Sequence, residues 1–447
     1  MTGRTNDDHV FYRSPAKFYP TVERGEGVYL WDTDGKRYLD GSGGAVVASI
    51  GHGIREIAAA AASQMEKVTF THGSQFTSRP AVELAERLVW MAPPGLERVY
   101  YCSIGSEAVE TAVKMVRQYQ VDRGKPSKYK VISRWTSFHG NSLGALSLGG
   151  HTGRRKYYLP LFPHTPHIPP AYCYRCPWGR EPASCSLECA DELERAILYE
   201  GPDAVSAFIA EPVVGATAGC LVPRDGYFQR IREICDRYDV LLIADEVMTG
   251  VGRTGRNFAL EHWSTVPDLI VCAKGLSAGY HPVNVVIATG EIHRVIREAT
   301  GTFVHGHTYS QNPLGCAVAL AVLDYMDAHG LVNRSAVLGA YLLEKLQVLR
   351  RHPMVGDIRG LGLFAGVELV KDRETKETFA PAQKVNALVG SRAFAKGLIT
   401  YPGGGGADGV HGDHILLAPP FIITEAQIDN LVATLDEAIG EVAAELG

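Results

Sequence analysis

The sequence predicts an α/β protein with a mostly parallel sheet, because runs of consecutive apolar residues alternate with helical stretches. The clearest stretch of helical periodicity is GYFQRIREICDRYD (226–239), in which Phe228, Ile231 and Ile234 lie at helical spacing. Strands that are apolar on both faces indicate a sheet covered by helices on both sides. The strand-like runs are RVYYC (98–102), KYKVIS (128–133), VSAFIA (205–210), VLLIA (240–244) and LIVCA (269–273).

Both ends of the chain predict a smaller α+β unit. Near the start, GVYLWDTDGKRYLD (27–40) reads as a hairpin that turns at Asp34-Gly35. Near the end, residues 358–370 look like one strand, and the glycine-rich residues 403–413 are expected to form a flexible loop. The other expected elements of this region are a helix over 382–397, strands over 398–401 and 414–420, and a last helix over 424–446.

Composition limits the function classes. The chain has 447 residues, enough for two or three domain-sized units, with 46% hydrophobic residues and a formal net charge of -5. No long run of one charge sign occurs, which argues against a partner that is nucleic acid or a membrane surface. The polar N-terminus MTGRTNDDHV does not resemble a secretion signal, and no apolar run approaches the ~20 residues that span a bilayer. We therefore expect a cytoplasmic location.

Chemically active residues follow the carboxyl ends of the predicted strands. An ammonium group at the mouth of the buried strand 269–273 is costly unless it has a partner or loses its proton. The carboxyl ends of parallel strands share one edge of a sheet, and ligands bind there. The residues at these ends are Gly105 and Ser106, Phe138 and His139, Glu211, Asp245, and Lys274.

Together these residue types suit one cofactor. The sequence SIGSEA opens a helix, whose free backbone N–H groups favour a phosphate. Phe138 offers a ring for stacking, and Asp245 is a carboxylate suited to a pyridinium N–H. Lys274, desolvated at the strand mouth, suits a Schiff base. Phosphate cradle, stacking ring, carboxylate and lysine indicate pyridoxal 5′-phosphate.

Several motifs resemble the class III (ω-amino acid, or ornithine-type) aminotransferases. ADEVMTGVGRTG (244–255) is followed by Lys274, as in that family. The resemblance runs from about residue 20 to residue 440, with the motifs in the family's order. The other motifs are SIGSEAVETAVKMVR (103–117), FHGNSLGALSLGG (138–150), IAEPVVG (209–215), GHTYSQNPLGCA (306–317) and LLAPPFIITEAQID (416–429).

The resemblance implies the fold type I architecture of pyridoxal-phosphate-dependent transferases. This fold has a large domain with a mostly parallel seven-stranded sheet and a small α+β domain built from both chain ends. On this chain it implies an N-terminal part of the small domain over residues 1–70, the large cofactor-binding domain over 71–320 and the rest of the small domain over 321–447. It also implies a homodimer, or a dimer of dimers, with active sites at the interface.

The family's residue roles carry over position by position. Gly105 and Ser106 should bind the phosphate, and Phe138, where many relatives have Tyr, should stack on the ring with His139 behind it. Asp245 should hold the pyridine nitrogen and Val247 should pack on the opposite ring face. Lys274 should carry the cofactor and then serve as general base and acid. Glu211 should lie near Asp245 and the ring oxygen, and Thr308 should reach the phosphate of the neighbouring subunit.

The implied activity is transamination from an amine or ω-amino acid donor to a keto acid such as pyruvate or 2-oxoglutarate. An aminomutase, a dialkylglycine decarboxylase or a phospho-lyase of the same class would use the same cofactor residues, so these alternatives stay open. A nicotinamide enzyme is disfavoured. The stretch Gly250–Gly255 matches G-x-G-x-x-G, but it is separated from its strand by Asp245 and Glu246 and lacks an acidic residue at the required spacing.

Four cysteines form a separate motif. Cys173, Cys176, Cys185 and Cys189 have the spacing C-x2-C-x8-C-x3-C, which suits a structural zinc ion or an iron–sulfur cluster. Free surface thiols and disulfides are the alternatives, and a reducing compartment disfavours disulfides. A metal-bound knuckle here would be a docking module in addition to the catalytic site.

The sequence leaves open which residue recognises a substrate carboxylate. Many relatives place an arginine on the strand before the APP segment, where this chain has Leu416 and Leu417. Others carry a mobile arginine before the proline that opens the nearby loop, where this chain has Tyr401 and Pro402. The remaining candidates are His411, His414, Arg154 and Arg155, and the aromatic residues Phe18, Tyr19 and Tyr158 are candidates to line the entrance.

Overall fold

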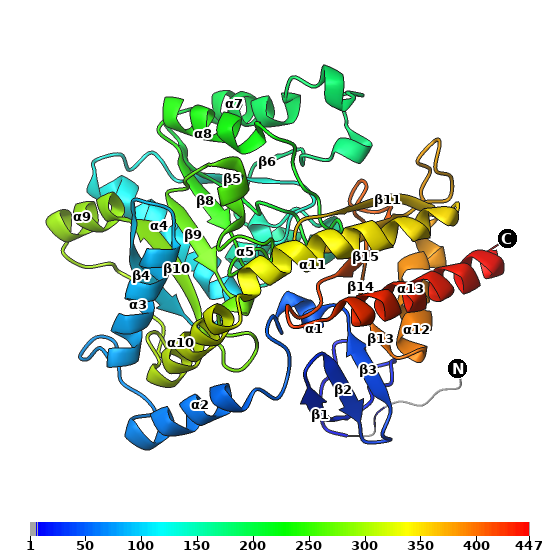
Figure 1. Cartoon of the computed structure of the whole chain (residues 1–447). Coiled ribbons are helices and arrows are strands. Elements are labelled where there is room, and N and C mark those ends of the chain that lie inside the picture. Colours follow the sequence, from blue (N-terminus) through cyan, green and yellow to red (C-terminus); the bar gives the residue numbers. More distant parts are fainter. Residues whose placement is uncertain (1–5, 7, 447) are drawn as a thin grey trace.

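A computed structural model describes residue 6 and residues 8–446. The predicted domain limits at residues 1 and 447 therefore lie outside the described residues, as does part of the polar N-terminal stretch. Three sheets organise the described chain, one of seven strands and two of four strands each. Figure 1 shows the large sheet flanked by helices, with the small sheets and the last helices grouped beside it.

The large sheet is mostly parallel, as predicted. Its strand β10 runs antiparallel to both of its neighbours, β4 and β9, whereas all other neighbouring strands are parallel. The strands, in spatial order, are β4 (Leu96–Cys102), β10 (Asn284–Thr289), β9 (Leu269–Cys272), β8 (Leu241–Asp245), β7 (Val205–Ala210), β5 (Lys130–Arg134) and β6 (His167–Ile168).

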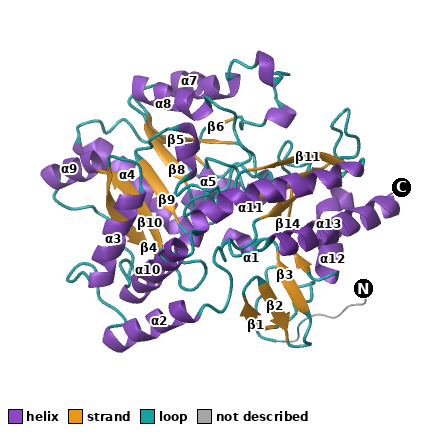
Figure 2. Cartoon of the chain, in the orientation of Figure 1, coloured by secondary structure: helices purple, strands orange, loops and turns teal. Residues whose placement is uncertain are grey.

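Helices cover both faces of this sheet, as Figure 2 shows. Alternate residues of one strand enter different core clusters: Ile209 packs in the cluster of α4, while Phe208 packs in the cluster of α7 and α8. This burial on both faces explains why the strands are apolar throughout. The helices on the first side are α4 (Gly105–Asp122) and α9 (Gly290–Ala299), and those in the second cluster include α3 (Arg79–Met91), α7 (Glu188–Glu200), α8 (Tyr227–Arg237) and α10 (Pro313–Ala328).

Local sequence fixes where several helices begin. The hydroxyl of Ser78 accepts a hydrogen bond from the Ala81 N–H at the start of α3. The side chain of Asn312 does the same for Gly315 at the start of α10, where Pro313 follows the cap. Among the described residues no single helix is long and apolar enough to cross a membrane, although α10 and the following helical segment to Arg351, bent by 63°, meet the length and composition limits as a pair.

The first small sheet joins the two ends of the chain. Strands β1 (Val22–Glu26), β2 (Tyr29–Asp32) and β3 (Arg37–Asp40) form an antiparallel ribbon, and β13 (Leu398–Ile399) adds to β3 in parallel. The predicted hairpin is present and turns through Gly35, whose φ is +79°. The prediction missed β1, which precedes the hairpin and pairs with its first strand.

The second small sheet corrects another prediction. Residues 358–370 do not form one strand, because β11 (Val355–Gly360) turns back into β12 (Ala365–Leu369). The turn includes Gly362 at φ +60°, where a Cβ would lie 2.5 Å from the backbone of Thr254. The sheet is completed by β15 (Asp413–Leu417) and β14 (Tyr401–Gly404), so the glycine-rich stretch begins as a paired strand rather than as loop.

The remaining elements connect these layers. Helix α11 runs alongside the second small sheet, and α12 and α13 pack together next to it (Figure 1). The bounds are α1 (Gly43–Val46), α2 (Arg55–Lys67), α5 (Leu143–Leu148), α6 (Thr152–Arg155), α11 (Leu331–Leu346), α12 (Val385–Ala395), α13 (Glu425–Leu446), and the short 3-10 helices Leu159–Leu161, Cys173–Arg175, Pro182–Ser184, Ala259–Trp263, Lys274–Leu276, Gln347–Arg351 and Pro381–Gln383.

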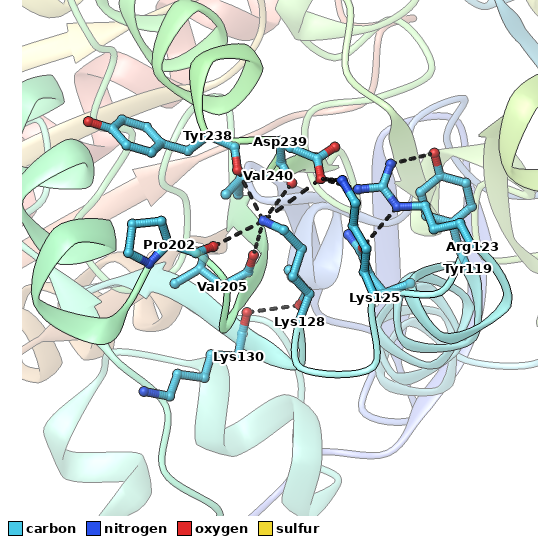
Figure 3. Close-up of polar contacts among 12 residues, drawn as sticks. Tyr119, Arg123, Lys125, Lys128, Lys130, Pro202, Val205, Tyr238, Asp239 and Val240 are labelled. Carbon is cyan, nitrogen blue, oxygen red and sulfur yellow. Dashed lines mark hydrogen bonds and ion pairs between the residues drawn. The ribbon is translucent and has the colours of Figure 1, made fainter.

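A buried lysine ties together the amino ends of the central strands (Figure 3). The ammonium group of Lys128 donates to four backbone carbonyl oxygens, each at 3.0 Å. Two belong to Pro202 and Val205 at the start of β7, and two belong to Tyr238 and Asp239 before β8. Burial lowers the pKa of Lys128, and the Asp239 carboxylate, 3.9 Å away, opposes that effect.

We expect Lys128→Met to reduce the free energy of unfolding by about 3 kcal/mol, because it leaves buried carbonyl groups without a donor. Thermal denaturation measures the effect. Lys125→Met is the matched control, since Lys125 also pairs with Asp239 but is about half exposed, and an exposed pair contributes about 1 kcal/mol or less. Equal losses in both variants would contradict a special role for the buried lysine.

Candidate active site

The carboxyl ends of four neighbouring strands deliver polar residues to one rim of the large sheet. Asp245 is the last residue of β8, and it pairs in register with Val271 of β9, three residues before Lys274. Glu211 directly follows β7. His139 comes from the loop after β5 and reaches Asp245. The structure therefore brings together four of the residues that the sequence predicted.

Asp245 is held in place by two hydrogen bonds. The Nδ1–H of His139 donates to its Oδ2 atom at 2.6 Å, and the Val247 N–H donates to its Oδ1 atom at 3.1 Å. Both the carboxyl group and the imidazole ring are buried. A carboxylate fixed in this way is oriented before any ligand arrives, which lets it hold a cationic N–H with little reorganisation.

Glu211 is a second buried carboxyl group at the same rim. It accepts hydrogen bonds from the Phe138 N–H at 2.9 Å and the Gly215 N–H at 3.2 Å. Burial raises its pKa above the usual glutamate range, and the neighbouring charge of Asp245 adds to that effect. Glu211 thereby fixes the backbone at Phe138, and the predicted stacking ring takes its position from that contact.

Lys274, which follows β9, has an unusual pKa and an unusual backbone conformation. Burial lowers the pKa of its ammonium group from 10.5 to about 8, while the carboxylates of Asp245 and Glu211 act in the opposite direction. Its φ is +40°, in the left-handed region that side-chain-bearing residues rarely adopt. Nζ donates to the carbonyl oxygen of Ala45 at 2.9 Å. The amine is therefore close to losing its proton at neutral pH.

The start of α4 offers an anion site. No side chain caps this end of the helix, so the N–H groups of Gly105 and Ser106 remain free for a ligand. A Cβ on Gly105 would lie 3.6 Å from Val247 and 3.8 Å from Ala273, which places the helix start beside Lys274. The Ser106 hydroxyl also accepts the Asn141 N–H at 3.0 Å.

These features test whether the residues present fit pyridoxal 5′-phosphate. An uncapped helix start suits a phosphate, and a buried, preoriented carboxylate suits a pyridinium N–H. The lysine beside them has a lowered pKa, as a covalent link to an aldehyde requires. The site residues of this chain fit the cofactor. Thr308 lies apart from this group, exposed in the loop before α10.

Comparison with known proteins agrees with this geometry. The family model for class-III aminotransferases matches residues 11–439. The chain belongs to the class-III aminotransferase family. It is 41% identical to the uncharacterized aminotransferase YodT of Bacillus subtilis, over 96% of each chain, and 37% identical to a putrescine–pyruvate aminotransferase of Pseudomonas aeruginosa, over 95% of this chain and 91% of the relative.

Solved structures give the same result. The omega transaminase of Pseudomonas jessenii in complex with PMP superimposes with a TM-score of 0.92 at 34% identity, and the alignment covers 98% of this chain and 97% of that one. The protein is thus a class III aminotransferase with the α/β fold type I architecture that the sequence predicted. Pyridoxal 5′-phosphate is the cofactor of this class.

The glycine motif 250–255 of this aminotransferase packs against residues from the C-terminal third of the chain. Gly255 has φ +84°, and a Cβ there would lie 2.6 Å from Ala336 of α11. Arg253 is buried, and it donates to the carbonyl oxygens of Leu363 at 2.9 Å and Pro419 at 2.7 Å. The motif opens no helix after a strand, so it lacks the geometry of a dinucleotide site.

The four clustered cysteines line one cavity of about 280 Å³. The negative charge of neighbouring thiolates adds to the burial that raises the pKa of Cys189 to about 12. In the part of the chain that the structure describes, however, no three His, Cys, Asp or Glu side chains are placed to hold a metal ion. The structure therefore gives no support to the predicted zinc or iron–sulfur site at Cys173, Cys176, Cys185 and Cys189.

The candidates for binding a substrate carboxylate differ in their burial and in their polar partners. Arg155 is buried and donates to the Gly149 oxygen at 2.7 Å and to the His167 ring at 2.8 Å. His411 pairs with Asp408 at 2.7 Å, and burial lowers the pKa of His414 to about 3, which leaves that ring uncharged. Leu416 and Leu417 lie in β15, and Tyr401 begins β14. Of the entrance candidates, Tyr19 stacks on Tyr12, and Tyr158 is exposed.

Sequence reasoning missed the segment that meets the lysine from the other side. Ala45 lies in α1, between Gly44 at φ +66° and Val46 at φ +64°. This irregular backbone turns the Ala45 carbonyl group toward Nζ. The signal available in the sequence is the Gly43-Gly44 pair, because adjacent glycines mark a backbone that side chains would not allow.

The lowered pKa of Lys274 predicts a pH-dependent cost in stability. Lys274 loses its proton near pH 10.5 in the unfolded chain and near pH 8 in the folded chain. The free-energy cost of desolvating its charged amine is therefore fully present below pH 8 and disappears as the pH approaches 10.5. Cofactor-free Lys274→Met should therefore denature at a higher temperature than the cofactor-free parent at pH 7. This difference should narrow as pH rises, with Lys156→Met as an exposed control. A less stable variant at pH 7 would contradict the assignment.

Proposed function

We propose that this aminotransferase binds pyridoxal 5′-phosphate through Lys274 and moves an amino group from an amine or ω-amino acid to a keto acid such as pyruvate or 2-oxoglutarate. The observation that carries the proposal is the grouping of Lys274, whose pKa is lowered to about 8, with the buried hydrogen-bonded pair of Asp245 and His139 at one rim of the sheet. Relatives named as a putrescine–pyruvate aminotransferase and a diaminobutyrate–2-oxoglutarate transaminase support both the donor and the acceptor classes.

Each residue has a defined task in this proposal. When bound, the cofactor supplies a ring that accepts electrons from the carbon bearing the substrate's amino group. Asp245 keeps a proton on the ring nitrogen, and His139 fixes the orientation of that carboxylate. Gly105 and Ser106 bind the phosphate with backbone N–H groups, while Phe138 and Val247 enclose the ring. Lys274 Nζ would remove the proton from the carbon that bears the donor's amino group, and in the reverse half-reaction it would deliver a proton to the corresponding carbon of the acceptor.

We expect the purified protein to be yellow and to lose that colour when an amine donor is added. Lys274→Ala should bind no cofactor covalently, and its turnover should fall by a factor of at least about 10³, because nothing replaces the general base. Absorbance spectra with and without amine follow the first half of the reaction. Addition of pyruvate, 2-oxoglutarate or succinic semialdehyde should restore the colour in the parent enzyme.

The same experiment tests the related activities. A decarboxylase would release carbon dioxide from the donor. A mutase or a phospho-lyase would turn over without any keto acid. Either result would contradict the proposed transamination but would leave the cofactor assignment intact, since all of these reactions use the same residues. Normal transamination by Lys274→Ala would overturn both.

We further propose that the enzyme acts as a homodimer in the cytoplasm. Large apolar side chains are exposed around α3 and the loop before α10. Soluble monomers rarely expose large apolar patches. They include Phe76 at 66% exposure, Trp90 at 72% and Tyr309 at 61%. Thr308 is exposed on the same loop, as a residue that reaches a second subunit must be.

Sedimentation of the purified enzyme should give at least twice the 48.5 kDa chain mass. Thr308→Ala should weaken cofactor binding about 10- to 100-fold, because a hydrogen bond to a charged phosphate is lost. Thr302→Ala, six residues earlier on the same exposed segment, is the control. A monomer that retains full cofactor affinity would contradict both the dimer and the role of Thr308.

A further inference from the structure

One arginine near Lys274 has no polar partner. The guanidinium carbon of Arg154 lies 4.4 Å from the centre of the Phe138 ring, so the group packs over the ring that we assign to the cofactor. Within the described chain its side chain forms no hydrogen bond and no ion pair. An arginine held by stacking alone can turn its five N–H donors toward a ligand without breaking an existing interaction.

The charge of Arg154 acts on the Lys274 amine. This positive charge is one of the causes that lower the pKa of Lys274, together with that of Arg253. It also lowers the pKa values of His151 and His414. Of the two guanidinium groups that act on Lys274, Arg253 is buried and donates through one nitrogen to two backbone oxygens, whereas Arg154 is held only by its contact with the Phe138 ring.

The surrounding backbone fixes the segment that carries this arginine. The His151 ring contacts the Gly404 carbonyl oxygen at 3.0 Å, which ties the start of α6 to β14. A Cβ on Gly409 would lie 2.3 Å from the Thr152 hydroxyl oxygen, so the glycine loop packs closely on α6. Arg154 thus lies on a segment that packs against the sheet containing β14. The contacts that hold this segment are made to the backbone at Gly404 and Gly409.

The other carboxylate-binding candidates are already engaged. The buried Arg155 bonds to Gly149 and His167, and His411 pairs with Asp408. His414 is uncharged and buried behind the glycine loop. A substrate carboxylate that enters between Lys274 and Phe138 is repelled by the negative charges of Asp245 and Glu211. It therefore requires a cation on the side away from these two carboxylates.

We propose that Arg154 is the carboxylate-binding residue of this active site, where its guanidinium group pairs with the carboxylate of keto acid and amino acid substrates. The proposal rests on the proposed function and deepens it. The guanidinium fork matches both oxygens of a carboxylate, whereas a lysine ammonium offers only a point charge. Amine donors that lack a carboxylate bind without this contact, so one site serves both substrate types.

The test compares Arg154→Ala with the holoenzyme of the parent. Calorimetry measures the dissociation constants of propionate and glutarate, which resemble keto acids but cannot react. We expect Arg154→Ala to weaken their binding about 10- to 100-fold, and to raise the KM of the keto acid similarly, because a charge-assisted pair is lost. The spectral half-reaction with a primary alkylamine should stay within about threefold of the parent.

Two further variants separate charge, stacking and local structure. Arg154→Lys should recover part of the carboxylate affinity, since it keeps the charge but not the planar fork. Lys156→Ala, which removes an exposed cation two residues away, should change nothing. The proposal is overturned if carboxylate binding is unchanged in Arg154→Ala, or if the alkylamine half-reaction falls as much as the keto acid reaction. A parent enzyme inert toward every amine would contradict the proposed function instead, while calorimetry still decides on Arg154.

Discussion

The candidate site is organised around one amine, desolvated at the end of a strand. Lys274 follows β9, a strand whose residues are fully buried, and the protein around it lowers its pKa to about 8. Asp245 ends β8, the neighbour of β9, Glu211 follows β7, the next strand along, and both carboxylates offset part of that cost. Parallel strand order is what places the two carboxyl groups beside the amine. The grouping of these side chains is therefore a direct result of the sheet topology.

A second lysine, Lys128, is buried at the amino ends of the strands, opposite the end where Lys274 lies. Lys128 meets four carbonyl oxygens, which together replace the water that its ammonium group loses. Lys274 meets one, from Ala45. The difference in hydrogen-bond partners fits the same residue type serving as a structural tie at one end of the strands and as an amine with a pKa near 8 at the other.

The sequence predicted the elements whose signals are local. Runs such as 205–210 and 269–273 became buried strands, and the residues that follow them met at one rim, because a topological rule converts strand ends into neighbours. The hairpin within 358–370 was not predictable, since Gly362 turns the chain only where the backbone of Thr254 approaches it. Adjacent arginines 154 and 155 look alike in sequence, and only the fold shows that Arg155 bonds to Gly149 and His167 while Arg154 packs over Phe138. The cysteine spacing suited a metal site, but spacing alone does not set the distances between thiols.

The sheet that joins the chain ends has a consequence for how the protein matures. Leu39 of β3 pairs with Leu398 of β13, and the Lys36 ammonium group bonds to the Phe394 oxygen, 358 positions away. The ribosome releases β1 to β3 long before β13 is synthesised, so β3 lacks this neighbouring strand until residues 398 and 399 have been translated. Ala45 lies just beyond β3. The segment that supplies the carbonyl partner of Lys274 therefore adjoins a sheet that needs residues from both regions of the chain before it is complete.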